Sequence, residues 1–428
     1  MSITSMFTAV SGMNVNGQAL SVVGDNIANM NTHGFKTNSV VFGDIVSQTV
    51  GSLGIGRGVL LNEVSQEFTQ GAFENTPSVL DLAVDGDGLF VVKKGNNTFY
   101  TRAGQFGIDK HGYATNPDGY KLQGYQYSTT GASSTVVNDI NVASINSQPK
   151  ASSSVTVYAN LDSTATIPAA FDVATPETTS NFTSTITVYD SLGTAHVVNI
   201  YFRKATEAAT GNTWEWNAVV SGSDNANSSN DQVQASGTLT FTSNGALNAE
   251  SLIAYPTVGF DFSGGATLDQ TIAFDFGESI TESGGTGFGG TVQYSGDSTT
   301  SFLNQDGYSS GTLKSLTIND DGIMSGIFTN GQTKNIAQIV LAKFISQEGL
   351  VKQGNGLYAE SFDSGQPIVT APGNSGTGQI LSNTLELSNV DLASEFVKMI
   401  IFQRGFQANS RMISTSDELM VELVNLKR

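Results

Sequence analysis

The sequence contains no cysteine. This absence excludes disulfide bridges, thiolate nucleophiles and cysteine-based metal sites together. Proline is scarce, with 8 residues in 428, and charged residues make up only 13%, whereas there are 47 glycines. Such a composition is typical of a β-rich protein with many turns, and the length is sufficient for two to four domains.

Positive charge is also scarce. There are 19 Lys and Arg against 38 Asp and Glu, which gives a net charge of −19. No basic patch is visible, so nucleic acid is excluded as an expected partner. The acidity concentrates in 151–300, where 15 acidic residues face only Arg203 and Lys204. We interpret this block as a solvated, mutually repelling surface, not as an acidic active site.

Long apolar runs are missing as well. No stretch approaches the roughly 18 apolar residues of a membrane span. The N-terminus lacks the basic region, the apolar core and the small-residue cleavage site of a secretory signal peptide. We therefore expect no membrane span, and we expect that an exported chain would keep its N-terminus.

Apolar residues recur in steps of three and four at both ends of the chain. The first series is Ile3, Met6, Val10, Met13, Gly17, Leu20, Gly24 and Ile27, and the second is Phe396, Met399, Phe406, Ile413, Met420 and Val424. This period predicts two helices with apolar seams that pack as coiled-coil partners, within the chain or between neighbouring subunits. Such ends indicate a building block more than a catalyst.

The N-terminal helix carries no charge before Asp25. A helix exposed to solvent normally carries charged side chains, so we expect this one to be covered on most sides. An ordinary buried helix of a globular domain is the alternative. Gly12, Gly17 and Gly24 each lower helix stability by about 1 kcal/mol relative to Ala, which predicts a segment that folds only on assembly.

Alternating strand patterns fill the middle of the chain, at 80–84, 89–93, 98–102, 120–127, 184–189, 196–202, 214–220, 237–242, 271–276, 313–318, 323–328 and 336–344. Gly-rich 51–58 is expected to be a loop, and Ser/Thr-rich 128–180 a linker or domain crossing. The prediction is a mostly β fold with a terminal α-helical coiled-coil domain. The domains are nested: 1–30 with 385–428 (helical), 31–70 with 370–384 (connecting), 71–148 with 301–369 (middle β) and 149–300 (inserted outer β).

No motif predicts a catalytic or metal site, and no cofactor is expected. Asp85-Gly86-Asp87-Gly88 resembles half of a calcium loop but lacks the distal glutamate, so a β-turn is the better interpretation. The three histidines, His33, His111 and His196, match no metal-binding spacing.

Segments at both ends resemble the flagellar axial proteins, the rod and hook family. At the front the match includes Asn26, Ile27, Ala28, Asn29, Asn31, Gly34 and Phe35. At the back it includes Ser388, Asn389, Val390, Asp391, Gln403, Arg404, Gln407, Ala408 and Asn409. The segments 80–92 and 100–109 resemble the β domain shared by the family, and 182–204 is similar to the outer domain of its hook members. The segment 128–180 matches no part of the family pattern.

The resemblance implies a structural subunit of the bacterial flagellar hook. Such a subunit polymerises into a flexible tube that joins the basal-body rod to the filament and transmits torque. The implied partners are further copies of the chain, the distal rod protein, the hook cap, the hook–filament junction protein and the flagellar type III export apparatus. The implied location is extracellular, in the flagellum. A distal rod protein shares both end signatures but is shorter and lacks the outer domain, and a secreted adhesin would not need heptads at both ends.

Overall fold

The computed structural model describes residues 3–50, 53–128, 131–143, 146–254, 259–282 and 284–426. The chain divides into two compact units. Unit 1 contains residues 1–145, 314–327 and 333–428, and unit 2 contains 146–313 and 328–332. Both chain ends therefore belong to unit 1, and unit 2 is an insertion in it. The predicted boundaries of the inserted domain were 149–300.

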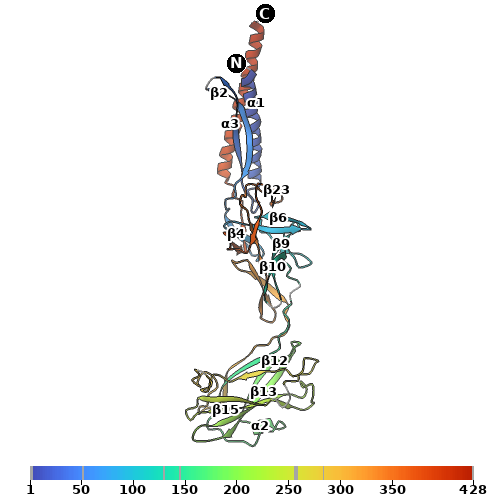
Figure 1. Ribbon diagram of the computed structural model, residues 1–428, viewed down its shortest axis with the longest axis vertical. Coiled ribbons are helices and arrows are strands. Elements are labelled where there is room, and N and C mark those ends of the chain that lie inside the picture. Colours follow the sequence, from blue (N-terminus) through green and yellow to red (C-terminus); the bar gives the residue numbers. More distant parts are fainter. Residues whose placement is uncertain are drawn as a thin grey trace. The chain divides into compact units, whose positions relative to one another are not determined.

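Two long helices from the chain ends pack side by side in unit 1 (Figure 1). They are α1 (Ile3–Ala28) and α3 (Leu392–Leu426). The Asp391 carboxylate accepts the Ser394 backbone N–H at 3.0 Å at the start of α3, as an N-cap residue does. At the end of α1, the Asn29 side-chain amide donates to the Asp25 carbonyl at 2.8 Å. The same carbonyl also accepts the Asn29 backbone N–H at 3.1 Å, so the side chain reinforces the last backbone bond of the helix.

A long antiparallel hairpin follows α1 and packs against it. Its strands are β1 (Asn38–Val50) and β2 (Leu53–Gln66). The prediction of a loop at 51–58 is therefore wrong for residues 53–58, while 51 and 52 lie outside the described residues. The Phe42 ring of β1 meets the Phe402 ring of α3 edge to face, with centroids 5.9 Å apart. The hairpin thus covers part of both helices.

The β domain of unit 1 is built mainly on one sheet, in which the strands lie side by side in a single path and the described pairings are antiparallel. The order along the path is β19 (Leu313–Ile318), β20 (Ile323–Phe328), β21 (Thr333–Ile339), β9 (Lys121–Tyr127), β5 (Leu89–Lys94), β6 (Asn97–Thr101), β24 (Leu357–Ala359) and β23 (Val351–Gly354). Attached to it are β7 (Gly107–Ile108), β8 (Ala114–Thr115), β10 (Ser133–Asp139), β22 (Leu341–Lys343) and β25 (Ile368–Thr370). Three strands from the first half of the chain, β9, β5 and β6, lie between two groups from the second half, so neither half could form this path alone.

Two short sheets tie the C-terminal segment to this domain. Strand β26 (Gln379–Ser382) pairs with β4 (Leu82–Asp85), and β27 (Thr384–Glu386) pairs with β3 (Phe73–Asn75). The predicted terminal domain of 385–428 therefore begins inside a strand, seven residues before α3 starts. These pairings hold the chain just before α3 against the segment that follows the β1–β2 hairpin.

Unit 2 encloses one apolar core between two sheets. The larger is antiparallel, in the order β12 (Phe182–Tyr189), β13 (Ala195–Thr206), β14 (Thr213–Val220), β15 (Gln232–Phe241) and β16 (Leu247–Ala254). The smaller contains β11 (Ser154–Asn160) between β17 (Ala273–Asp275) and β18 (Thr299–Gln305), and a short helix α2 (Pro176–Thr179) precedes β12. Alternate residues such as Trp214 and Trp216 are fully buried in the core. The prediction that all of 128–180 is a linker is wrong, because β11 is the central strand of the smaller sheet.

Candidate functional site

The contact between α1 and α3 is made by small and polar residues. On α1 the most buried positions are Ala9, Gly12, Val15, Ala19, Val23 and Asn26. A Cβ atom on Gly12 would lie 2.8 Å from the Asn409 side chain, and one on Gly405 would lie 2.7 Å from the Asn16 side chain. Each asparagine also donates to the carbonyl of the glycine four residues before it, Asn16 to Gly12 at 2.6 Å and Asn409 to Gly405 at 2.9 Å.

This reciprocal arrangement sets both the direction and the register of the helix pair. Residue 12 faces 409 and residue 16 faces 405, so the chain rises along one helix as it descends along the other. The helices are antiparallel, and two glycines let them approach closely around the two asparagines. The residues in contact are spaced by the predicted heptad period, but they are neighbours of the predicted seam residues and not those residues themselves.

The predicted seam residues border this contact instead of forming its centre. Half-buried in the single chain are Val10, Met13, Leu20, Ile27, Met399 and Ile413. Still more exposed are Met6 (46%), Phe396 (50%), Phe406 (38%) and Met420 (47%). The side chains of Ile3 and Val424 lie outside the described ones. Gly17 and Gly24 face open space, where an added Cβ would meet nothing within 4 Å.

A large apolar surface remains uncovered on α3. The exposed apolar side chains of this helix are Phe396, Val397, Ile400, Ile401, Phe406, Met412, Met420 and Val421. Single exposed apolar residues are ordinary, but eight large ones on one helix mark an interaction surface. We call these eight residues the α3 stripe.

Below the helices, a buried ion triad joins three distant segments of unit 1. Glu386 is completely buried, and its two carboxylate oxygens pair with Lys36 at 2.7 Å and with Arg102 at 2.5 Å. It also accepts the backbone N–H of Gly71 at 2.9 Å. The Arg102 guanidinium donates to the carbonyls of Val84 at 2.7 Å and Gly86 at 2.8 Å, and also to that of Gly88. All three charged groups are thus paired and hydrogen-bonded, as buried charges must be.

The electrostatics of the triad favour an ionised carboxylate. Burial by itself would raise the pKa of Glu386, but the positive charges of Arg102 and Lys36 and their hydrogen bonds outweigh it and lower the pKa. Nearby, burial raises the pKa of the Tyr358 hydroxyl to about 12, although a hydrogen bond from Gln66 at 3.0 Å acts in the opposite direction. The Glu386 carboxylate is therefore ionised at neutral pH.

The motif asparagines bond the same segments to one another. The Asn26 side-chain oxygen accepts the backbone N–H of Asn38 at 2.9 Å, and its nitrogen donates to the Asn38 carbonyl and to Glu395. The Asn389 side-chain oxygen accepts both the N–H and the hydroxyl of Thr37 at 2.7 Å. Its nitrogen donates to the Glu67 carbonyl at 2.8 Å. Each asparagine acts as donor and acceptor together, which aspartate or leucine could not do.

Gly34 and Phe35 fill the space between these bonds. Gly34 has a φ of +70°, and a Cβ there would lie 2.6 Å from the Arg102 backbone. Only glycine tolerates both the conformation and the close approach. Phe35 is buried, and the Lys352 ammonium lies 4.7 Å from its ring centroid. We call Asn26, Gly34, Phe35, Lys36, Arg102, Glu386 and Asn389 the junction.

The remaining motif residues lie outside the junction. Asn31, Asp391, Gln403 and Arg404 are exposed in the single chain, while Asn29 and Asp391 act at helix ends. Sequence reasoning missed Lys36, Arg102 and Glu386. A signal existed for Arg102, because it follows Tyr100 by two residues in a predicted strand, on the face that turns inward.

The described residues contain no group of three or more His, Asp or Glu placed to hold a metal ion. Within the same described ranges, no helix combines the length and the apolar composition that crossing a bilayer requires.

Comparison with known proteins matches four family models in chain order. They are the flagellar basal body rod protein (6–36), the flagellar hook protein FlgE/F/G D1 domain (83–164), the flagellar basal body protein FlaE D2 domain (160–308) and the flagellar basal body rod FlgEFG protein C-terminal (381–426). The first and last cover α1 and α3, the second covers part of the β domain, and the third covers most of unit 2. These matches define a structural protein of the flagellar axis.

Full-length relatives specify the family. The flagellar hook protein FlgE of Salmonella typhimurium is 34% identical over 429 residues, covering 99% of this chain and 100% of the relative. That of Escherichia coli is 33% identical, covering 98% and 99%. That of Borreliella burgdorferi is 32% identical, covering 99% of both. The chain belongs to the flagellar hook protein family and is a structural subunit of the hook.

Proposed function

We propose that the chain polymerises through α1 and α3, whose exposed apolar residues are covered by the helices of neighbouring copies. The observation that carries this proposal is the α3 stripe, which the chain itself leaves exposed. Burial of apolar area at about 25 cal/mol per Å² provides the driving force for such an assembly. The predicted seam residues of α1 lie beside the stripe-bearing helix and extend the same surface.

The glycines of α1 support the same proposal. Gly12 is explained by its contact with Asn409, whereas no contact among the described residues requires a glycine at position 17 or 24. Each lowers helix stability by about 1 kcal/mol relative to Ala. Close approach of a neighbouring helix on this face would explain both glycines, because a larger side chain would block it.

The junction would transmit torque between the helices and the β domain. Its buried triad and its asparagine bonds are directional and need fixed partners, so it resists twisting more than an apolar contact of the same size. Unit 2, with its excess of acidic residues, would present a surface along which neighbouring copies slide when the tube bends. In this proposal the protein has no catalytic role.

The remaining partners and the location belong to the same proposal. They are the distal rod protein, the hook cap, the hook–filament junction protein and the flagellar type III export apparatus, with a place outside the cell and no cleaved signal peptide. The full-length similarity to hook proteins supports these assignments. It also favours the hook over the distal rod and over a secreted adhesin.

The test replaces Leu20 or Phe406 with Asp and measures secretion and hook formation separately. An unpaired carboxylate in a helix–helix contact costs several kcal/mol. Every subunit repeats this defect, so assembly should fail while unit 2 stays folded. Ser21→Ala, at an exposed position next to Leu20, should assemble normally. Hooks of normal length from both Asp variants would contradict the proposal.

A further inference from the structure

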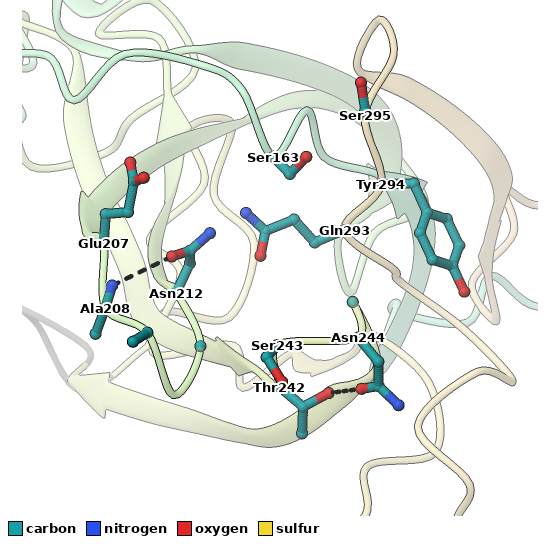
Figure 2. Close-up of a pocket in the computed structure, with 13 residues that line it drawn as sticks. Ser163, Glu207, Ala208, Asn212, Thr242, Ser243, Asn244, Gln293, Tyr294 and Ser295 are labelled. Atoms are coloured by element: carbon teal, nitrogen blue, oxygen red, sulfur yellow. Dashed lines mark hydrogen bonds between the residues drawn. The ribbon is translucent and has the colours of Figure 1, made fainter.

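Unit 2 contains a polar cavity of about 680 Å³ at one end of its larger sheet (Figure 2). Two hairpin turns form one side of it, 207–212 between β13 and β14 and 242–245 between β15 and β16. Ser163 and the segment 293–295 form the other side. Its volume lies in the range of about 300 to 1,000 Å³ that is typical of small-molecule sites.

Gln293 gives this cavity an unsatisfied donor. Its side chain is 4% exposed, and its amide nitrogen has no hydrogen-bond partner among the described residues. Figure 2 shows that nitrogen pointing into the space between Asn212 and Ser163. Buried amide groups in proteins are nearly always paired, so an unpaired one beside a cavity indicates a missing acceptor.

Asn212 directs a second donor toward the same space. Its side-chain oxygen accepts the backbone N–H of Ala208 at 3.4 Å, which fixes the orientation of the amide. The nitrogen then faces Gln293 across the cavity (Figure 2). Two amide N–H₂ groups that converge are satisfied together by one oxygen placed between them.

The charges around the cavity exclude an anion as the source of that oxygen. The Lys204 ammonium is buried, and it is already paired with Glu207 at 2.9 Å and bonded to the Ser163 carbonyl at 2.8 Å. The Glu207 carboxylate is largely exposed and lies at the cavity. A negatively charged ligand would be repelled by it. A neutral ligand with several hydroxyl groups fits instead, because a hydroxyl both accepts and donates.

We propose that this cavity binds a neutral saccharide unit. One hydroxyl oxygen accepts hydrogen bonds from the amide nitrogens of Gln293 and Asn212, and a second hydroxyl donates to the Glu207 carboxylate. The side chains of Asn244 and Tyr294 lie at the edge of the same cavity, where the remaining hydroxyls extend. The site does not depend on polymerisation, so it stands or fails separately from the proposed function.

The experiment records saturation-transfer NMR on the full chain, kept below its polymerisation concentration. The probes are methyl β-D-glucoside, N-acetyl-D-glucosamine and maltose as neutral sugars, and D-glucuronic acid and N-acetylneuraminic acid as anionic ones. We expect saturation transfer to at least one neutral sugar and none to either anionic sugar. The signal should be lost in Gln293→Leu and in Asn212→Asp, and it should persist in Asn96→Asp, which changes an exposed asparagine of unit 1.

Fluorescence of Trp214 and Trp216, both buried in unit 2, shows whether each variant is folded. Asn212→Asp keeps the shape of the side chain, so it tests the donor if Gln293→Leu disturbs the core. Absence of transfer to every neutral sugar overturns the proposal, as does an equal signal in the folded variants. A defect in hook formation of these variants without any sugar signal would make the cavity a contact between subunits, and would also overturn it.

Discussion

Three charged side chains and two asparagines bind the ends of the chain to its β domain. Lys36 and Glu386 are separated by 350 positions in the sequence, and Asn389 bonds to Thr37 across a similar distance. Contacts of this kind form only when both chain ends are in place. The two terminal segments therefore become ordered at the junction only when the β domain is folded.

The first prediction concerns Glu386. Changing Glu386→Gln leaves Lys36 and Arg102 buried without a countercharge, which costs about 3–5 kcal/mol when one member of a buried pair is removed. Calorimetry should show a lower melting temperature for unit 1. The transition of unit 2, followed by the fluorescence of its two tryptophans, should not move. The exposed Glu348→Gln serves as the control, with an effect within about 0.5 kcal/mol.

The same variant predicts a pH dependence. The pKa of Glu386 is lower in the folded than in the unfolded chain, so its stabilisation is present above the ordinary glutamate pKa of about 4.3. It is lost as the pH falls through the lower, folded pKa. The difference in melting temperature between wild type and Glu386→Gln should be constant near neutral pH and should shrink at acidic pH. A difference that stays unchanged down to pH 3 would mean that Glu386 is not ionised in the fold.

The sequence predicted few of the side-chain contacts in the junction. Asn26, Gly34, Phe35 and Asn389 were found through a resemblance, which did not say what their side chains bind. The partners of an ion pair 350 residues apart have no local signal, since no period or turn motif relates them. The residue type of Gly34 has a local explanation, because its φ of +70° is a conformation that favours glycine.

For the two terminal helices, the heptad period predicted the helices correctly, but the residues at the centre of their contact are not the predicted ones. The heptads at both ends correctly indicated two long helices that pack together. Within one chain, the contact uses Gly12, Asn16, Gly405 and Asn409, which a search for large apolar residues passes over. The predicted seam lies beside this contact, and its role between subunits stays a prediction.

The second prediction separates the two faces of α1. Gly17→Ala should stabilise the helix of the single chain by about 1 kcal/mol, because no atom of the described residues lies within 4 Å of the new methyl group. It should weaken assembly, because the methyl group would enter the contact with a neighbouring helix. Circular dichroism measures the helix and the critical concentration measures the assembly. Ser21→Ala adds helix propensity at an exposed position and should leave the critical concentration unchanged. Equal assembly of both variants would leave Gly17 without a role between subunits.

Strand elements were predictable where alternation had one buried face. The patterns at 89–93, 184–189 and 214–220 correspond to β5, β12 and β14 within a few residues. Strands β1 and β2 were missed because Gly51–Gly58 reads as a loop. Strand β11 was missed although its burial alternates, because it lies in a Ser-rich context that favours a linker. In both cases, tertiary pairing outweighed local composition.

At the scale of the whole molecule, a single chain leaves apolar residues of its terminal helices exposed to solvent. Its terminal helices pair with each other through glycine and asparagine, and they leave the α3 stripe exposed, which we propose that further copies cover. The insertion of unit 2 into unit 1 follows from this arrangement, because the two ends must meet to form the helix pair. The order of the predicted elements, a helix, then strands, then a second helix, indicated that nested order, whereas local patterns did not predict the path of strands from both halves.

The most direct test uses the absence of cysteine, which lets a single thiol be introduced as a unique probe. Met420→Cys lies on the stripe, where the wild-type side chain is 47% exposed, and Asn96→Cys lies in an exposed turn of the β domain. Labelling by a maleimide should be fast at both positions in the monomer. In the assembled polymer, labelling at position 420 should fall at least tenfold while position 96 stays reactive. Equal labelling of Met420→Cys before and after assembly would contradict the account, because the stripe would then remain open in the polymer.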